Sequence, residues 1–239
     1  MAHNPWLDHN SVFGEHRVHI RTLLILVFFA MLPCRRSEGG LPRPTVLYTI
    51  FKVDPPPAIM EYIRDELASI MSPMGFHIEW RSIPQGRDYP EAAKLAVITF
   101  KGRCDTSGNL PVFRNGGSLG LTHIVDGAIL PFSEVDCDAI RAFIQKELWM
   151  RYSDTRAKIF GRAVARVLAH ELYHVLARTS KHRSCGLGKS TYTAAELLSN
   201  EFQFGKGDAI ALQEGKTMED WENASRVPKA RGAPKCDFD

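Results

Sequence analysis

The segment HELYH at residues 170–174 places two histidines and a glutamate at a spacing suited to metal chemistry. Residues four apart share one face of a helix, so His170 and His174 can offer two imidazole nitrogens to one metal ion. Glu171 lies one position further round the helix, where its carboxylate can act as a general base toward water at the metal. Zinc is the expected cofactor, one ion per chain, because it accepts neutral imidazole and needs only three protein ligands in a catalytic site.

The longer segment HELYHVLARTSKHRSCG, residues 170–186, resembles the zinc metallopeptidases of the H-E-x-x-H type, the zincins. The expected order of elements over residues 45–180 is similar to that of their metzincin branch. Metzincins continue the motif as H-E-x-x-H-x-x-G-x-x-H, whereas Ala177 and Ser180 stand at those last two positions here. The segment also resembles a group of uncharacterised exported bacterial proteins that share HELYH followed by Thr, His and Gly. The resemblance implies a peptide-bond hydrolase whose third metal ligand departs from the metzincin spacing.

Two residues compete for the position of third ligand. His182 follows His174 by eight residues, within the polar stretch RTSKHRS, and a helix that ends around 178–180 and folds back would present it to the metal. The alternative resembles the gluzincin arrangement, a glutamate on a following helix, and would use Glu196 in TAAELL or, as a poorer second, Glu201. We expect His182 and keep Glu196 as the alternative. A donor for the developing oxyanion is also needed, and Tyr192 and Tyr173 are the candidates.

The elements that must position this segment are first a strand over 45–53 and an amphipathic helix that follows the prolines at 55–57 and ends near Pro73. Apolar residues at three- and four-residue spacing define its buried face: Ile59, Ile63, Leu67, Ile70 and Met74. Two further strands are expected over 76–83 and 92–102. Residues 119–132 then form two short apolar runs around Asp126-Gly127, which predicts a hairpin.

The second half of the chain is expected to be mainly helical. A short helix over 135–149 begins at Asp136 as its cap, and Ser153 or Asp154 caps a long helix that continues to about 177. The buried side of the long helix is expected to carry Val164, Leu168, Leu172 and Val175. Helices over 194–204 and 207–214 follow. The predicted fold is α/β of the α+β kind: a small zincin-like domain with a mixed, twisted sheet, a backing helix, a long active-site helix and a small helical C-terminal part.

The N-terminal region indicates export. Arg17 and Arg21 precede an uncharged run over 22–34, which is shorter than the roughly 20 residues of a membrane span but suits a signal peptide. We therefore expect an export segment at 1–36, a linker at 37–44, a catalytic domain at 45–220 and a flexible tail at 221–239. The protein is expected to be periplasmic or extracellular, without a stable membrane span after cleavage. It would be membrane-anchored if this segment is retained or if Cys34 is lipidated.

Export changes the interpretation of the cysteines. Besides Cys34 there are four, and an even set in an exported protein predicts two disulfides. Three connectivities exist for four cysteines. Pairing nearest partners in sequence predicts Cys104–Cys137 and Cys185–Cys236.

Composition sets the remaining expectations. The 239 residues are 44% hydrophobic and 24% charged, and the net charge of +3 comes from scattered Lys and Arg residues. This pattern gives no indication of a nucleic-acid partner. The expected partner is a peptide or protein substrate, and the protein is expected to be a monomer. The hairpin at 119–132 is the predicted substrate contact, with His123 facing solvent. The alternative is a catalytically inactive zinc-binding protein or a disulfide-stapled extracellular binding module.

Overall fold

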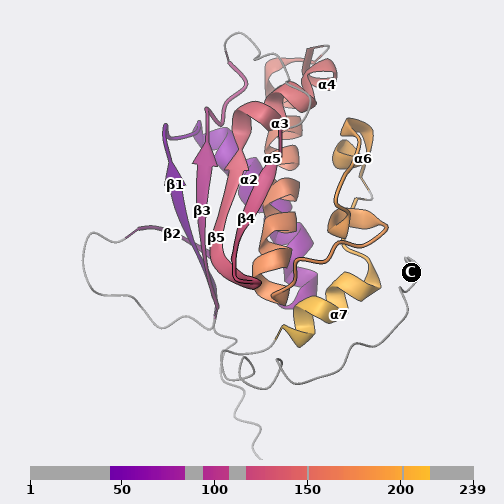
Figure 1. Ribbon diagram of the computed structural model, residues 1–239. Coiled ribbons are helices and arrows are strands. Elements are labelled where there is room, and N and C mark those ends of the chain that lie inside the picture. The colour runs from indigo at the N-terminus through magenta and orange to yellow at the C-terminus, as the bar shows by residue number, and fades with distance from the viewer. Residues whose placement is uncertain (1–43, 84–93, 108–116, 150, 201, 216–239) are drawn as a thin grey trace, which may run out of the picture. The chain divides into compact units, whose positions relative to one another are not determined.

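The computed structural model describes residues 44–83, 94–107, 117–149, 151–200 and 202–215 (Figure 1). Five strands in these residues form one mixed sheet. Their order across the sheet is β2 (Ile78–Ser82), β1 (Thr45–Phe51), β3 (Lys94–Lys101), β5 (Ala128–Asp136) and β4 (Gly120–Val125). β1 runs parallel to β2 and β3, β3 runs parallel to β5, and β4 alone is antiparallel to its neighbour. The predicted fold class, α+β with a mixed sheet, is confirmed.

The predicted hairpin is the connection between β4 and β5. Asp126 and Gly127 both have positive φ, 51° and 80°, which is the backbone that a two-residue hairpin turn requires. β5 continues to Asp136, four residues beyond the predicted run, because its second half pairs with β3 on the other side. β4 is left as the edge strand of the sheet, and its pairing with β5 shifts register between Thr122 and Ile124.

Two helices cover one face of the sheet: α2 (Pro57–Met71) and α5 (Ser153–Ala177) (Figure 1). The apolar positions predicted for both helices are buried, except that Met74 falls in the short 3-10 helix η1 (Ser72–Met74) and is only partly buried. The two helices approach closely at Gly161, where an added Cβ would lie 2.6 Å from the Cβ of Tyr62. The sheet contributes Leu47, Ala96, Ile98, Phe100 and Val135 to the same core.

The helical segments differ from the predicted ones at their ends. The helix expected over 135–149 is divided into α3 (Cys137–Phe143) and α4 (Gln145–Trp149), and Asp136 caps α3 by accepting a hydrogen bond from Ala139 N at 2.9 Å. The predicted cap of α5 is wrong: the capping position is Tyr152, and its side chain makes no capping hydrogen bond.

The helix expected over 194–204 is also shorter than predicted. α6 (Ala194–Leu198) ends because Ser199 is extended, and Arg166 Nη1 donates to the carbonyls of Leu197 and Ser199 at 2.6 Å each. The last helix is α7 (Lys206–Glu214), close to the predicted piece. α5 runs between the sheet on one side and α6 and α7 on the other (Figure 1).

A disulfide joins Cys104 to Cys137, as predicted, with a Cα–Cα distance of 5.0 Å. Both cysteines are buried, and the bond ties the chain after β3 to the first residue of α3. Cys185 is also disulfide-bonded, but its predicted partner Cys236 lies outside the described residues, so that pairing stays a prediction.

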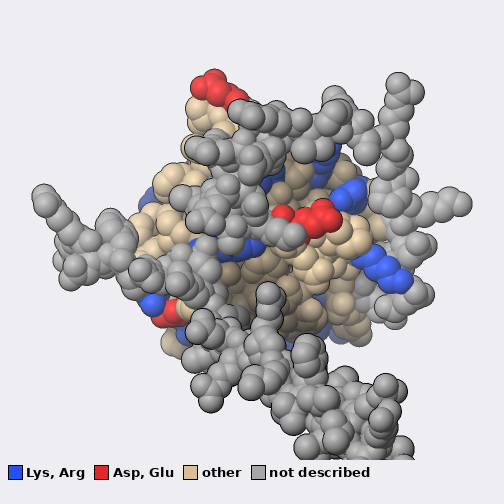
Figure 2. All heavy atoms as spheres, turned by 90° about the horizontal axis from the view of Figure 1, so that it is seen from below, with Lys and Arg blue, Asp and Glu red and all other residues tan. Residues whose placement is uncertain are grey.

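Several predictions concern regions outside the described residues: the export segment at 1–36 with Cys34, nearly all of the linker at 37–44, and the tail at 221–239. Among the helices that the structure describes, none has the length and apolar character needed to cross a membrane. On the described part of the face in Figure 2, Lys and Arg residues lie interspersed with Asp and Glu, and neither sign forms a continuous patch.

Candidate metal centre

His170 and His174 lie on the last two turns of α5, one helical turn apart, and each is only 6% exposed. Their Nε2 atoms are 3.1 Å apart. His170 Nδ1 lies 2.6 Å from the carbonyl oxygen of Leu187, and His174 Nδ1 lies 2.6 Å from that of Thr179. A carbonyl oxygen can only accept, so in each ring Nδ1 carries the proton and donates it. Both Nε2 atoms of the neutral rings therefore present lone pairs toward the same point.

The electrostatic environment keeps both rings neutral. Burial lowers the pKa of His170 to about 4, against the opposing effect of the Leu187 carbonyl, and the neighbouring His174 and His182 lower it further. Burial likewise lowers the pKa of His174. Neutral imidazole is the form that binds a metal ion, so these rings can bind one without first releasing a proton.

His182 joins this pair from the loop that follows α5. Its ring centroid lies 5.2 Å from that of His170 and 4.8 Å from that of His174. One nitrogen from each of the three rings falls within 4.8 Å of the others, and the described residues add no fourth His, Cys, Asp or Glu to this group. The structure thus brings together the three histidines that the sequence proposed as ligands.

The loop reaches this position because α5 ends at Ala177. Arg178 follows with a left-handed φ of 49°, and the amide of Thr179 donates to the carbonyl of His174 at 3.2 Å. The turn therefore occurs one residue after the position that holds glycine in the metzincin pattern. An arginine supplies it at a conformational cost of about 1 kcal/mol.

Glu171 is buried beside the histidines and is bound by the edge strand of the sheet. Thr122 Oγ1 donates to its Oε2 at 2.6 Å, and Ser133 Oγ lies 2.9 Å from the same Thr122 hydroxyl. Gly120 leaves the space that the carboxylate fills, since a Cβ there would lie 2.5 Å from Glu171 Oε1. Burial raises the pKa of Glu171 to about 7, and the hydrogen bond from Thr122 opposes that rise.

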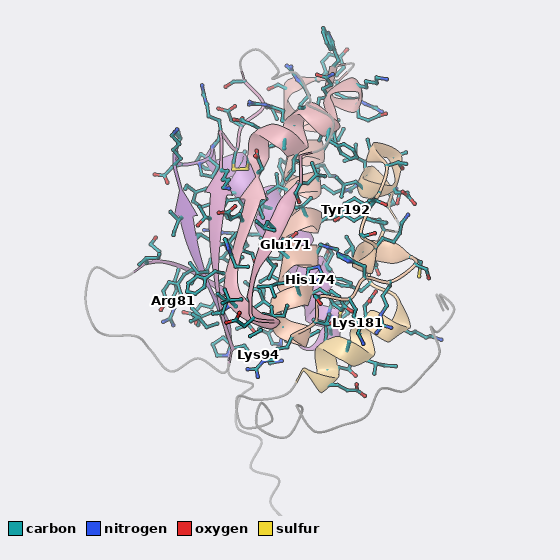
Figure 3. The ribbon with its side chains drawn as sticks, in the orientation of Figure 1. Arg81, Lys94, Glu171, His174, Lys181 and Tyr192 are labelled. Carbon is teal, nitrogen blue, oxygen red and sulfur yellow. A yellow bond between two sulfur atoms is a disulfide. The ribbon has the colours of Figure 1, made fainter. Side chains whose placement is uncertain are left out.

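A cavity of about 410 Å³ opens onto Glu171 and the three histidines. Its other walls are formed by the start of β4 with the residues before it, by Phe143 of α3, and by the segment at 190–192. Figure 3 shows Glu171 and His174 on α5, with Tyr192 on the chain that lies between α5 and α6. The three histidines, the buried carboxylate and β4 therefore share one opening.

No family model matches this chain, and no curated protein matches it either.

The two tyrosines considered as oxyanion donors lie in different places. Tyr192 lines the cavity, and its ring centroid is 5.9 Å from that of His170. Burial raises its pKa, so the hydroxyl keeps its proton. Tyr173 is 1% exposed and packs against Phe204 in the core, outside the cavity lining. Only Tyr192 remains a candidate donor.

Glu196, the alternative third ligand, is engaged elsewhere. Its Oε2 accepts a hydrogen bond from Thr193 N at 2.8 Å and caps α6, while Oε1 pairs with Lys189 Nζ at 2.5 Å. The bond from Lys189, followed by that from Thr193, lowers the pKa of Glu196 to about 2. It is absent from the group of three histidines. Glu201 lies outside the described residues.

Sequence reasoning missed the residues that hold the site in place. Thr122 was within the predicted hairpin and Ser133 directly follows it, but no pattern assigned either residue to Glu171. The alternation of buried and exposed positions along the two strands would have predicted that both side chains point inward. It would not have predicted which residue of the helix they contact. His123, on the opposite side of β4, has a side chain 45% exposed and 3.6 Å from Glu134, as expected for a solvent-facing residue.

Proposed function

We propose that this chain is a zinc-dependent metallopeptidase, in which His170, His174 and His182 hold the metal and Glu171 is the general base. The observation that carries the proposal is the convergence of three histidine nitrogens from two separate segments within 4.8 Å, beside a buried carboxylate. The H-E-x-x-H spacing had indicated His170 and His174, and His182 was the expected third ligand, with Glu196 as the alternative.

The donor set fits a metal ion of the zinc type. The Nε2 lone pairs of His170 and His174 face each other at 3.1 Å, and two lone pairs at that distance repel unless a cation lies near both. Three imidazoles without a fourth protein ligand form a catalytic zinc set, whereas a structural zinc has four. When bound, zinc lowers the pKa of a coordinated water and polarises a carbonyl group. The Nδ1 bonds to the Leu187 and Thr179 carbonyls hold the rings in the binding tautomer.

Glu171 supplies the proton transfers. Its carboxylate takes a proton from the attacking water and then gives that proton to the amine nitrogen of the broken peptide bond. A pKa near 7 suits both transfers at neutral pH, since the group must hold the proton and then release it. Thr122 fixes Oε2, and a hydroxyl is suited to this task because it can donate to a carboxylate and accept from a carboxylic acid.

The substrate in this proposal is a peptide in extended conformation. β4 is the edge of the sheet and forms a wall of the cavity, so its free side can pair with a peptide as an added strand. In this proposal Tyr192, which also lines the cavity, donates a hydrogen bond to the carbonyl oxygen as negative charge develops there.

Export belongs to the same proposal. It is supported by the basic residues and uncharged run at 17–34 together with the Cys104–Cys137 disulfide, because disulfides persist in oxidising compartments. Fractionation of cells that produce the full chain tests it. Recovery of the processed protein outside the cytoplasm is expected, and a reduced, unprocessed protein in the cytoplasm would contradict it.

The function is tested by comparing wild type with Glu171→Gln and His182→Ala. Metal content by elemental analysis is expected to be one zinc per chain in wild type and in Glu171→Gln, and much less in His182→Ala. Hydrolysis of fluorescent casein is expected only in wild type. Zinc binding without any hydrolysis of a broad peptide library would support the alternative of an inactive zinc-binding protein, and absence of zinc from wild type would refute the metal centre.

A further inference from the structure

The three proposed ligands depend on two very different supports. His170 and His174 are fixed by a long buried helix, whereas His182 is exposed and lies in the chain between α5 and the short 3-10 helix η2 (Gly186–Gly188). A metal site needs all three nitrogens at fixed positions, so whatever holds this loop also determines the affinity of the site.

The loop is closed on itself directly after His182. The amide of Arg183 donates to the carbonyl of Gly188 at 2.7 Å, and Arg183 forms an isolated bridge with Lys189. The amide of Leu187, whose own carbonyl accepts from His170, donates to the carbonyl of Gln203 at 3.0 Å. The loop thereby meets the segment that leads into α7.

The side chain of Arg183 extends this connection to α7. Its Nη2 donates to the carbonyl of Gly207 at 3.2 Å, and its Nε lies 3.3 Å from Oδ1 of Asp208. Gly188 packs directly on the same carboxylate, since a Cβ there would lie 2.6 Å from Asp208 Oδ1. Arg183 and Gly188, the two residues whose hydrogen bond closes the loop, therefore both contact Asp208.

Asp208 is a conspicuous partner because it is a carboxylate that is only 1% exposed. Its Oδ2 accepts a hydrogen bond from Gly205 N at the start of α7, and its Oδ1 lies toward Arg183, while the side chain of Tyr173 on α5 also interacts with this carboxylate. Burial of a charged group is costly unless it is paired, so Asp208 and Arg183 each restrict where the other can lie. Nothing in the proposed hydrolysis uses Asp208.

We propose that Asp208 is a positioning residue for the metal centre: through Arg183 it fixes the loop that presents His182. The inference rests on the metal centre proposed above. It predicts that the charge of a residue outside the cavity lining changes metal affinity, and that it does so only through His182.

The test is a double-mutant cycle in the full chain, with zinc affinity measured by competition with a chromophoric chelator. The four proteins are wild type, Asp208→Asn, His182→Ala and the double variant. Asparagine keeps the shape of Asp208 and its bond to Gly205 but loses the charge. We expect Asp208→Asn to weaken zinc binding by about 10-fold, the lower end of the range for residues that orient ligands, and to have no further effect in the His182→Ala background.

Asp105→Asn is the matched control. Asp105 forms a similar buried pair with Arg141 at 2.9 Å, next to the Cys104–Cys137 disulfide. This control is expected to change stability but leave zinc affinity within about twofold, as for sites that do not share partners. Equal loss of affinity in Asp208→Asn and Asp105→Asn, or equal loss with and without His182, would overturn the proposal because the effect would then be general destabilisation.

Two further measurements test the proposal if the Asp208→Asn variant does not fold or if wild type binds no zinc. If Asp208→Asn does not fold, Arg183→Met breaks the same pair from the loop side and is expected to weaken zinc binding to a similar degree. If wild type binds no zinc, the metal centre fails, and the positioning role is judged in the metal-free protein by hydrogen exchange at the Arg183 amide. Faster exchange in Asp208→Asn than in Asp105→Asn supports the positioning role, and unchanged exchange overturns it.

Discussion

At the scale of single residues, the site depends on partners that hold the reactive groups. The carbonyls of Leu187 and Thr179 select the tautomers of His170 and His174, and Thr122 holds one oxygen of Glu171. Each partner lies in a different segment from the residue it holds, or beyond the end of the helix. The chemistry of the motif is therefore local, but its geometry is imposed by other segments.

The Thr122 hydroxyl should matter for turnover more than for metal binding. Thr122→Val keeps the shape but removes the bond to Glu171, and we expect kcat to fall about 10- to 100-fold because the base is no longer held in position. Zinc content should be unchanged. Thr122→Ser keeps the hydroxyl and should retain most of the activity. Steady-state kinetics on a fluorescent peptide measures this, and wild-type kcat in the valine variant would refute the role.

At the scale of elements, α5 is the rigid support of the site, and the short helices α6 and α7 pack beside it. α5 places His170, Glu171 and His174 in the core, and α6 is held beside it by Arg166, which binds the carbonyls at the C-terminal end of α6. α6 has only five residues, too few for a stable helix by itself, so its cap and its packing must supply the stability.

The capping box of α6 predicts a pH-dependent contribution to stability. The folded pKa of Glu196, about 2, is below its ordinary value of 4.5, so the folded state favours the carboxylate. This contribution is present above pH 4.5 and is lost as the pH falls toward 2. Glu196→Gln should therefore lower the melting temperature at pH 7, and the difference from wild type should shrink as the pH decreases below about 4.5.

Thermal unfolding at several pH values provides the measurement. Glu61→Gln is a suitable control, because Glu61 is exposed on α2 and the described residues show no hydrogen bond or ion pair of its side chain. A difference between Glu196→Gln and wild type that stays constant from pH 7 to pH 3 would mean that the carboxylate charge is not the source of the stability.

At the scale of the whole molecule, the site lies where parts of the chain far apart in sequence meet. The sheet supplies Gly120 and Thr122, α5 supplies the motif, and the C-terminal segments supply His182, Tyr192 and Asp208. The Cys104–Cys137 disulfide joins the chain after β3 to the first residue of α3, at a sequence separation of 33.

Removing that disulfide should destabilise the fold without removing the metal site. For a closed loop of this length, the double substitution Cys104→Ser with Cys137→Ser should cost about 3 to 4 kcal/mol of unfolding free energy, mainly by freeing the unfolded chain. Urea unfolding of the metal-free protein measures the loss. Zinc affinity of the folded variant should stay close to wild type, because all three histidines lie in other segments. A loss below about 1 kcal/mol would show that the bond adds little to stability.

The sequence was sufficient wherever a property depended on local spacing. The apolar faces of α2 and α5, the Asp126-Gly127 turn and the convergence of His170 with His174 all follow from the fixed geometry of a helix or a two-residue turn. The Cys104–Cys137 pairing was also predicted, from proximity in sequence.

Only the tertiary structure shows which residues from different segments lie in contact. Periodicity cannot choose between His182 and Glu196, because their positions depend on the turn at Arg178 and on the capping box of α6. It also cannot pair Thr122 with Glu171 or Asp208 with Arg183, since those contacts cross between strand and helix and between loop and helix. The sequence by itself therefore determined which residues can do the chemistry, and only the packing of distant segments decided which of them share one site.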